Sequence, residues 1–379
     1  TEEQLMIQQA AREFAQQQCL PGVIERDENQ IVPKEQLKQL ANLGLLGMMT
    51  NPTYGGAGMD TVSYVLAMEE ISKVDSSVSV AMSVNNSLVC WGLEEYGSEA
   101  QKQKYLTPLA QGIKDEELYI GAFLLSEPEA GSDATHQHTS AVKEGDHYII
   151  NGVKNWITNG STASVYLVIA QTDYTKGHKG INAFIVEKNT PGVSVGAKEN
   201  KMGIRGSDTH AVSFMDVKVP AENRIGEEGF GFNFAMKTLN GGRIGIAAQA
   251  LGIASGAYEL ALAYSKERKT FGKPIHEHQA IQFKLAEMAT RIETARLLCY
   301  KAAWEKDNHL DYTTTAAMAK LYASDVAMWV TVEAVQVHGG YGFVKEYHVE
   351  RLMRDAKITQ IYEGTSEIQK MVIGRSITR

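Results

Sequence analysis

Cysteine is scarce in this chain of 379 residues. Only Cys19, Cys90 and Cys299 are present, and an odd number at such wide spacing excludes a disulfide framework and a zinc knuckle. A reducing compartment is expected. An excess of positive charge is also lacking, because 37 Lys and Arg stand against 45 Asp and Glu, a net charge of −8. A nucleic-acid partner requires a basic face, so none is expected, and a polyanionic ligand must be held by local cations or helix N-termini.

Signals for export and for membrane insertion are missing too. Residues 1–18 are polar and rich in glutamine, without the basic patch and apolar run of a signal peptide. The longest apolar stretch, Ile244–Ala257, is too short and too rich in Gly and Gln to span a bilayer. We expect a soluble intracellular protein with no membrane partner, cytoplasmic in a bacterium or in the mitochondrial matrix of a eukaryote.

Several common cofactor and catalytic motifs are absent. The chain has no G-x-G-x-x-G at the spacing of a dinucleotide-binding unit, no P-loop and no G-x-S-x-G elbow. Close histidine pairs occur at His136/His138 and His276/His278, but neither pair has a helical i, i+4 partner with a carboxylate. Exposed loop histidines are therefore favoured over a metal site, and no metal is expected.

Three regimes of hydrophobic periodicity follow one another along the chain. Residues 1–119 have helical spacing, as in the leucines from Leu37 to Leu46. From about 120 to 226 the period becomes that of strands separated by Gly, Asn and Asp, in segments 148–153, 165–170, 183–186 and 211–214. The helical period then returns in 232–265, 278–306 and 314–338, lengths typical of bundle helices. The predicted fold class is α+β, mostly α: an N-terminal helical domain (1–119), a central antiparallel β-barrel or sandwich (120–228) and a C-terminal four-helix bundle (229–379).

One carboxylate near the C-terminus stands just before a predicted helix start, in the segment Tyr362–Glu367. Ser366 is followed three residues later by Gln369 and then by an apolar run, the spacing of a capping box. By itself, Glu363 is explained by a favourable interaction with the dipole of that helix.

Five segments in order resemble the acyl-CoA dehydrogenase family, and the similarity extends over essentially the whole chain. They are 125–133 (LSEPEAGSD), 154–160 (KNWITNG), 268–275 (RKTFGKPI), 336–342 (QVHGGYG) and 362–365 (YEGT). The short-chain or butyryl-CoA subclass is the most similar. The resemblance implies desaturation of an acyl-CoA thioester between Cα and Cβ, with Glu363 as the base that takes the α-proton. It implies FAD as the cofactor, since no side chain accepts the β-hydride, an electron-transfer flavoprotein as electron acceptor, and a homotetramer built as a dimer of dimers.

The family pattern also assigns cofactor contacts. Around the flavin ring it implies Phe123, Leu125, Ser126, Trp156, Ile157 and Thr158. For the pyrophosphate and its surroundings it implies Arg268, Phe271 and Gln279, and for the adenosine side Thr365, Ser366 and Glu367. The segment Gln336, Val337, His338, Gly339 and Gly340 is implied as the one offered by another subunit. Simpler alternatives are turn capping for Ser126, core packing at a strand end for Trp156 and a helix C-cap for Gly339 and Gly340.

Ser132, Asn240, Arg243 and Gly364 are the implied substrate contacts, with turn capping as the alternative for Ser132 and a surface salt bridge for Arg243. Some relatives carry the base immediately before this arginine, but position 242 is glycine here, so the base assignment depends on Glu363 alone. Close relatives have Asp where this chain has Asn240, and we expect the change to weaken CoA affinity without affecting the chemical step.

The substrate class follows from the helix expected at the far end of the acyl pocket. Segment 74–101 contains no Lys or Arg, and a dicarboxylate substrate would need a cation there. A short straight-chain acyl-CoA is therefore expected, with a medium-chain substrate as the first alternative. A flavin-holding electron-transfer subunit that desaturates nothing, and an oxidase, are the others.

Overall fold

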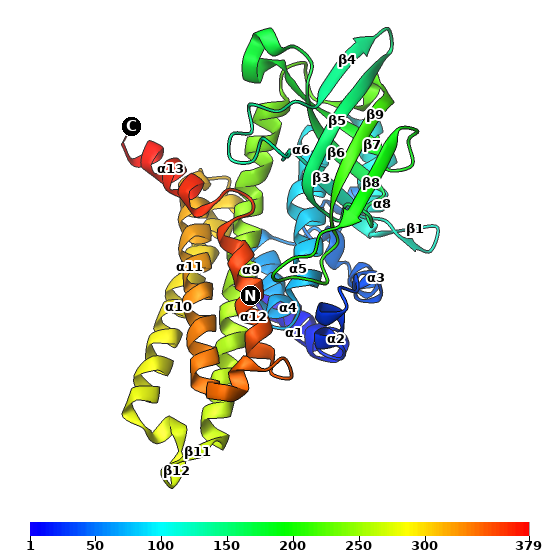
Figure 1. Ribbon diagram of the computed structural model, residues 1–379. Coiled ribbons are helices and arrows are strands. Elements are labelled where there is room, and N and C mark those ends of the chain that lie inside the picture. The colour runs from blue at the N-terminus through cyan, green and yellow to red at the C-terminus, as the bar shows by residue number, and fades with distance from the viewer. Residues whose placement is uncertain (379) are drawn as a thin grey trace.

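Figure 1 shows a computed structural model of the chain, in which residues 1–378 are described. Helices of the N-terminal part lie between a β domain at one end and a long helical bundle that extends away from it. The predicted fold class is confirmed: the chain is mostly helical, with its strands gathered in the middle third.

The N-terminal part consists of short helices, of which α1 and α5 pack against α4, a helix that is buried along almost its whole length. The helices of this part are α1 (Glu2–Phe14), α2 (Val23–Glu28), α3 (Lys34–Asn42), α4 (Thr61–Ser72), α5 (Ser76–Ser83), α6 (Trp91–Tyr96), α7 (Glu99–Gln101) and α8 (Thr107–Gln111). Asp60 and Asp75 cap α4 and α5 by accepting backbone N–H groups of the first turn. A π-helical turn, η4 (Val84–Cys90), joins α5 to α6, and such turns often occur near functional sites.

The β domain is one eight-stranded sheet with strand order β10-β7-β6-β4-β5-β9-β8, and β3 pairs with β6. Its strands are β3 (Gly121–Leu124), β4 (Ser140–Glu144), β5 (His147–Thr158), β6 (Val165–Gln171), β7 (Ile181–Glu187), β8 (Val193–Lys198), β9 (Thr209–Pro220) and β10 (Arg224–Ile225). Most pairs are antiparallel, as predicted, but β3 and β4 both run parallel to β6. The prediction failed there because the β4–β5 hairpin lies between β3 and β6 in the chain, so that β6 returns in the direction of β3.

The C-terminal part is built on α9 (Gly231–Glu267), against which α10 (Gln279–Asp307) and α11 (Thr313–His338) pack. These three helices match the three predicted bundle segments to within two residues at each end. A small hairpin, β11 (Lys269–Thr270) and β12 (Lys273–Pro274), joins α9 to α10, and α12 (His348–Ala356) and α13 (Ser366–Ile377) end the chain. Glycine allows close packing along α9: a Cβ on Gly252 would stand 2.4 Å from the carbonyl oxygen of Glu69 in α4.

Helix α9 contains Ile244–Ala257, the apolar stretch that was expected to be too short to span a bilayer. Among the described residues it is the one helix long and apolar enough, by length and composition, to cross a bilayer, so the stretch is not too short when its whole helix is counted. Of its most apolar 18-residue window, 72% is buried inside the molecule, as in the core helix of a globular protein.

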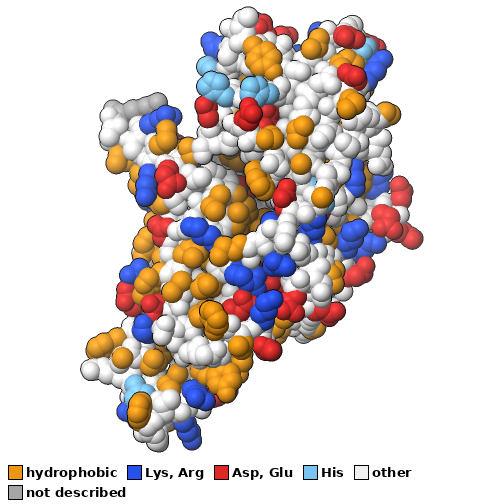
Figure 2. Space-filling model, in the orientation of Figure 1, with side chains coloured by type: hydrophobic (Ala, Val, Ile, Leu, Met, Phe, Trp, Pro, Cys, Tyr) orange, Lys and Arg blue, Asp and Glu red, His pale blue; other side chains and the backbone are white. Residues whose placement is uncertain are grey.

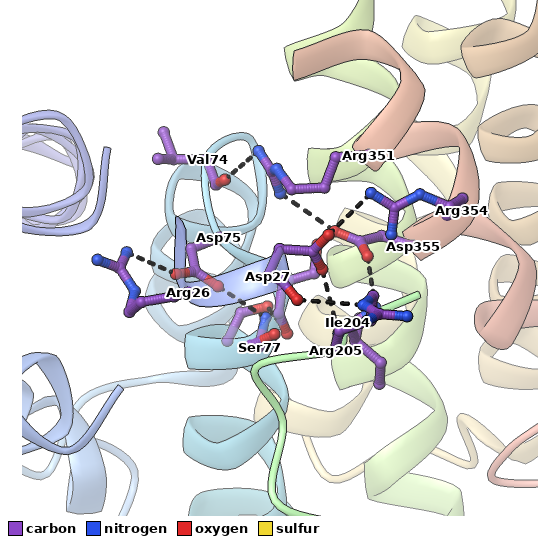
Figure 3. A network of polar contacts seen from close by, with 12 residues as sticks. Arg26, Asp27, Val74, Asp75, Ser77, Ile204, Arg205, Arg351, Arg354 and Asp355 are labelled. Carbon is purple, nitrogen blue, oxygen red and sulfur yellow. Dashed lines mark hydrogen bonds and ion pairs between the residues drawn. The ribbon is translucent and has the colours of Figure 1, made fainter. Parts of the chain in front are cut away.

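A polar network joins the β domain to the helices (Figure 3). Arg354 of α12 donates to Asp27 of α2 at 2.8 Å. Arg351 donates to the carbonyl of Val74 at 2.8 Å and to Asp355 at 3.1 Å. Asp355 also accepts the backbone N–H of Ile204, in the loop between β8 and β9. These bonds between distant segments fix the β domain against the bundle.

Candidate active site

Glu363 lies in a short turn between the 3-10 helix η10 (Lys357–Gln360) and α13. Both Glu363 and Gly364 have left-handed backbones, with φ of 52° and 90°. The conformation is ordinary for glycine but costs about 1–3 kcal/mol for a residue such as glutamate. A strained backbone persists only where the surroundings fix it, and such strain is concentrated at functional sites.

Side chains from two helices hold the turn. Gln369 of α13 donates from Nε2 to the carbonyls of Glu363 at 3.2 Å and Gly364 at 2.9 Å. Lys320 of α11 donates to the same Gly364 carbonyl at 2.7 Å. The N-cap of α13 is Thr365, so the predicted capping box of Ser366 and Gln369 is wrong. Gln369 donates instead to the carbonyls of Glu363 and Gly364 in the left-handed turn.

The Glu363 carboxylate is enclosed although the residue as a whole is only partly buried. Its Oε2 is shielded from solvent and has no hydrogen-bond partner among the described residues. A Cβ on Gly242 of α9 would stand 2.1 Å from this oxygen and 2.7 Å from Cδ2 of Leu88. Glu363 therefore occupies the space that a side chain at 242 would need, which is the structural reason why position 242 carries none.

Burial raises the pKa of Glu363 to about 7, while Lys320 and Arg243 act in the opposite direction. Burial outweighs the effect of these two side-chain cations. An unpaired carboxylate that titrates near neutral pH has the properties of a general base.

Arg243 is 5% exposed, so a surface salt bridge is the wrong interpretation of this residue. Its Nη1 donates to Oδ1 of Asn240 at 2.6 Å, and Nδ2 of Asn240 donates to Oγ1 of Thr313 at 3.2 Å. Burial lowers the pKa of Arg243, and Glu363 raises it. Asn240 thus fixes the arginine close to the carboxylate, whereas Ser132 is exposed on the loop between β3 and β4.

The predicted flavin residues form one wall where β3 meets β5. The Lys154 amine donates to the Leu125 carbonyl at 2.9 Å, and the Asn155 N–H donates to the Ser126 carbonyl at 2.8 Å. The Ser126 hydroxyl has no hydrogen bond within residues 1–378, so nothing supports turn capping as its role. A bulge in β5 gives Trp156 a φ of 62° and leaves its side chain 61% exposed.

Core packing is therefore the wrong interpretation of Trp156. Ile157 is 2% exposed, so only its backbone is available to a ligand. The ring of Phe123 lies 6.2 Å from that of Phe234. Figure 2 shows a hollow with a hydrophobic floor between α13 and the β domain.

The remaining predicted cofactor residues gather at the opposite end of the bundle (Figure 1). The Arg268 guanidinium lies 5.6 Å from the ring of Tyr341, next to the 336–340 segment. Phe271, at the tip of the β11–β12 hairpin, is 97% exposed, and Gln279 begins α10. Gly339 ends α11 with a φ of 61°, as the C-cap interpretation predicted, and Gly339 and Gly340 both face open space.

The two sets of predicted cofactor residues lie far apart within one chain. From Gly242 to Arg268, α9 advances 26 residues, roughly 40 Å at 1.5 Å per residue. The family resemblance placed only 336–340 on another subunit. The structure puts Arg268 against Tyr341, next to that segment, and Phe271 and Gln279 follow Arg268 in the connection from α9 to α10.

Sequence reasoning missed Lys320, the cation nearest the turn. The available signal was a lysine in an alanine-rich stretch of a predicted bundle helix, with Ala316, Ala323 and Ser324 on the same helical face. Within residues 1–378 no group of three or more potential metal-ligating side chains occurs.

Comparison with known proteins gives consistent results. Family models for acyl-CoA dehydrogenase match the N-terminal domain over residues 1–113, the middle domain over 122–217 and the C-terminal domain over 229–378. The chain is 53% identical over 379 residues to the short-chain specific acyl-CoA dehydrogenase of Clostridium acetobutylicum, covering 100% of this chain and 99% of that protein.

Solved structures of similar proteins also match the chain over its whole length. Butyryl-CoA dehydrogenase of Megasphaera elsdenii superimposes with a TM-score of 0.97 at 51% identity, over 100% of this chain and 99% of that one. A structure from work on the electron transferring flavoprotein of Acidaminococcus fermentans has a TM-score of 0.97 at 50% identity, over 100% and 98%. A glutaryl-CoA dehydrogenase of Mycobacterium smegmatis in complex with FADH2 has a TM-score of 0.93 at 34% identity, over 100% and 95%.

Proposed function

This chain belongs to the acyl-CoA dehydrogenase family, and from that membership we propose that it converts butyryl-CoA to crotonyl-CoA with FAD as cofactor. The observation that carries the proposal is the Glu363 carboxylate, which is enclosed, has no hydrogen-bond partner for Oε2 and has its pKa raised to about 7. Relatives named as short-chain or butyryl-CoA dehydrogenases support the substrate class.

Glu363 takes the α-proton of the thioester. Its anion is desolvated in the enclosed site, which raises its basicity, and Arg243 and Lys320 keep an anionic fraction at neutral pH. The electron pair left at Cα forms the new double bond as the β-hydride departs. FAD, when bound, supplies the acceptor for that hydride, which no side chain can provide. The backbone N–H of Glu363 is the donor that we expect to polarise the thioester carbonyl.

The residues present fit a flavin at the β-domain wall. Trp156 offers a planar, exposed ring held by a bulge, and Ser126 offers a hydroxyl that the chain leaves free. Leu125 and Thr158 are the expected neighbours of these two residues at the flavin, and Thr365, Ser366 and Glu367, at the start of α13, are the residues that we propose for the adenosine side. The buried pair of Lys154 and Glu127, whose charged atoms lie 2.7 Å apart, holds the loop that carries Leu125.

Helix α9 favours a short acyl chain. Gly242, Gly245 and Gln249 share one face of the helix because they are spaced by three and four residues. A Cβ on Gly245 would stand 2.5 Å from the Tyr64 hydroxyl, and the buried Gln249 donates to the carbonyl of Ser76 at 3.0 Å. Polar groups therefore close the space within two turns of Glu363, and a long alkyl chain would have to displace them.

The assembly and the electron acceptor complete the proposal. Since the second set of cofactor residues lies roughly 40 Å away along α9, a neighbouring subunit must supply Arg268, Gln279 and the 336–340 segment. A homotetramer arranged as a dimer of dimers meets this need. We propose that an electron-transfer flavoprotein takes the electrons, in line with the flavoprotein study that yielded one of the similar structures.

Anaerobic mixing of the FAD-loaded protein with acyl-CoA substrates tests the proposal. Butyryl-CoA should bleach the flavin absorbance within seconds and yield crotonyl-CoA, identified by mass spectrometry. Octanoyl-CoA should react with a lower kcat/KM, and the opposite order would favour the medium-chain alternative. A flavin that is reduced by no acyl-CoA would identify a non-desaturating electron-transfer subunit.

A further inference from the structure

Lys320 is a lysine with 0% exposure in the middle of α11. Fully buried lysines are rare unless they are paired with a carboxylate. Among the ion pairs of residues 1–378, none includes Lys320. Its one hydrogen bond goes to a backbone carbonyl, that of Gly364, at 2.7 Å. A lone buried ammonium group next to the candidate base needs an explanation.

The hydrogen bond acts on the strained part of the catalytic turn. Glu363 and Gly364 both have left-handed backbones, and the Gly364 carbonyl accepts two donors, Lys320 at 2.7 Å and Gln369 at 2.9 Å. Lys320 comes from the bundle and Gln369 from α13, so the turn is held from two sides. Only Lys320 brings a charge.

The electrostatic surroundings connect Lys320 to the carboxylate. The charged and titratable groups facing Glu363 are Lys320 from α11, Arg243 from α9, Tyr64 from α4 and Tyr362 in the same turn. Burial raises the pKa of both tyrosines, which are therefore neutral at physiological pH.

Burial lowers the pKa of Lys320 to about 8, while Glu363 acts to raise it. Arg243 also faces the amine and acts to lower this pKa. Asp325 and Glu367 act to raise it, and neither contacts the amine closely enough to form an ion pair. At pH 7 the amine is still mainly protonated. Glu363 is then the main negative charge within the enclosed site that it can stabilise.

We propose that Lys320 is a positioning residue for the desaturation: it holds the Glu363–Gly364 turn through the Gly364 carbonyl, and its charge sets the pH range in which Glu363 is ionised. This inference rests on the proposed function. Replacing buried ions by apolar groups of similar size is often neutral or stabilising, so stability alone gives no reason for a charge at this position.

Three variants separate the hydrogen bond from the charge. Lys320→Gln keeps a donor and removes the charge, Lys320→Met removes both, and Gln369→Met removes the other donor while leaving Lys320 in place. Each FAD-loaded protein is mixed anaerobically with saturating butyryl-CoA between pH 5.5 and 9.5, and the rate of flavin bleaching is fitted for the pKa of its acid limb.

Removing a nearby cation disfavours the anion, so the acid limb should move to higher pH. We expect an upward shift of about one pH unit or more in Lys320→Gln and Lys320→Met, and no shift in Gln369→Met. The rate of Lys320→Gln should fall about fivefold or more at pH 6.5 and recover to within about threefold of the wild type at pH 9. A merely structural residue would not give this recovery.

A second readout follows proton abstraction alone. Acetyl-CoA has an α carbon but no β carbon, so it loses no hydride, and entry of solvent deuterium into its methyl group reports the base. The pH dependence of this exchange should shift in the two Lys320 variants by the same amount as the bleaching rate.

Unshifted acid limbs in both Lys320 variants would overturn the inference. Loss of FAD or of the fold in both variants would overturn it as well, because Lys320 would then be a structural residue. In either case a wild-type protein that is still bleached by butyryl-CoA keeps the proposed function intact. Only a wild type that fails to bleach refutes that function.

Discussion

Two adjacent glycines of α9 differ sharply in what their neighbours permit. A Cβ on Gly242 would stand 2.1 Å from Oε2 of Glu363, whereas the nearest atom to a Cβ on Gly241 would be 3.7 Å away, an ordinary contact. Position 242 must carry no side chain if the Glu363 carboxylate is to lie where it does, whereas position 241 can carry one.

Gly242→Ala should therefore displace Glu363 and lower the rate of flavin bleaching by butyryl-CoA by about 10²-fold or more, the range for a misplaced general base. Gly241→Ala is the matched control. It should keep the rate and, because alanine is favoured over glycine inside a helix, raise the free energy of unfolding by about 0.5–1 kcal/mol. Equal rates in the two variants would show that Glu363 does not act from its observed position.

Asn240 is the clearest departure from the family pattern. Its Oδ1 accepts a 2.6 Å hydrogen bond from Arg243, a role that an aspartate would perform with a charge. Asn240→Asp should strengthen the hold on Arg243 or on the amide groups of CoA by about 1–2 kcal/mol. We expect KM for butyryl-CoA to fall about tenfold or less and kcat to stay nearly unchanged. Steady-state kinetics decide the matter, and a large change in kcat would place the residue at the reacting centre.

Three residues show what the sequence could and could not predict about individual side chains. Glu363 was selected as the candidate base from its motif. The left-handed backbone of Trp156 was not, because it arises from a bulge created by pairing with β9, a partner some 50 residues away. Lys320 was missed because a lysine in an alanine-rich helix is usually exposed, and only the packing of α9, α11 and α13 reveals that it is buried.

Among the elements, α9 carries most of the site. One face of this helix places Gly242 beside the Glu363 carboxylate and Gly245 beside the Tyr64 hydroxyl. Gln249 lies on the same face, about one turn after Gly245. Glycine there allows close contact, and the one long polar side chain closes the space. The acyl-chain preference of the protein is therefore expected to depend on Gln249.

Gln249→Ala should open room for further methylene groups. Two of them contribute about 1.6 kcal/mol if buried, so the ratio of kcat/KM for hexanoyl-CoA to that for butyryl-CoA should rise about tenfold. The variant should also lose stability, since the Tyr362 hydroxyl loses its acceptor. Ser79→Ala is the control, because it removes a partner of Gln249 but keeps the glutamine in place. An unchanged ratio in Gln249→Ala would remove Gln249 from the acyl site.

Elements with long periodic patterns were predicted well from sequence, and elements defined by their partners were not. Helices α9, α10 and α11 repeat their apolar positions over seven or more turns, so local sequence suffices. The parallel direction of β3 and the cap of α13 depend on β6 and on the carbonyls of Glu363 and Gly364, which lie outside the local window.

At the scale of the whole molecule, we expect the cofactor sites to be completed between subunits. Gly340 faces open space within one chain and has an ordinary backbone, so a larger side chain there disturbs nothing in the subunit itself. Gly340→Leu should nevertheless weaken both FAD retention and the tetramer, because we expect the segment 336–340 to contact the cofactor of a neighbouring subunit. Light scattering and flavin content of the purified variant measure both. A fully flavinylated, intact tetramer would argue against the shared site.

The overall architecture was predictable from the order of its periodicities, but the separation of the two sets of cofactor residues was not. That separation follows from the length and straight course of α9, which puts Arg268 and Phe271 at the end away from the β domain (Figure 1). A motif states which residues serve a cofactor. It does not state which copy of the chain supplies them.

Replacing the base tests the central claim most directly. Glu363→Gln keeps the size of the side chain and much of its hydrogen bonding but cannot accept a proton. With FAD content and acyl-CoA affinity matched to the wild type, stopped-flow mixing with butyryl-CoA should show flavin bleaching slowed by at least about 10²–10⁴-fold. Bleaching of Glu363→Gln at a rate close to that of the wild type would contradict the account.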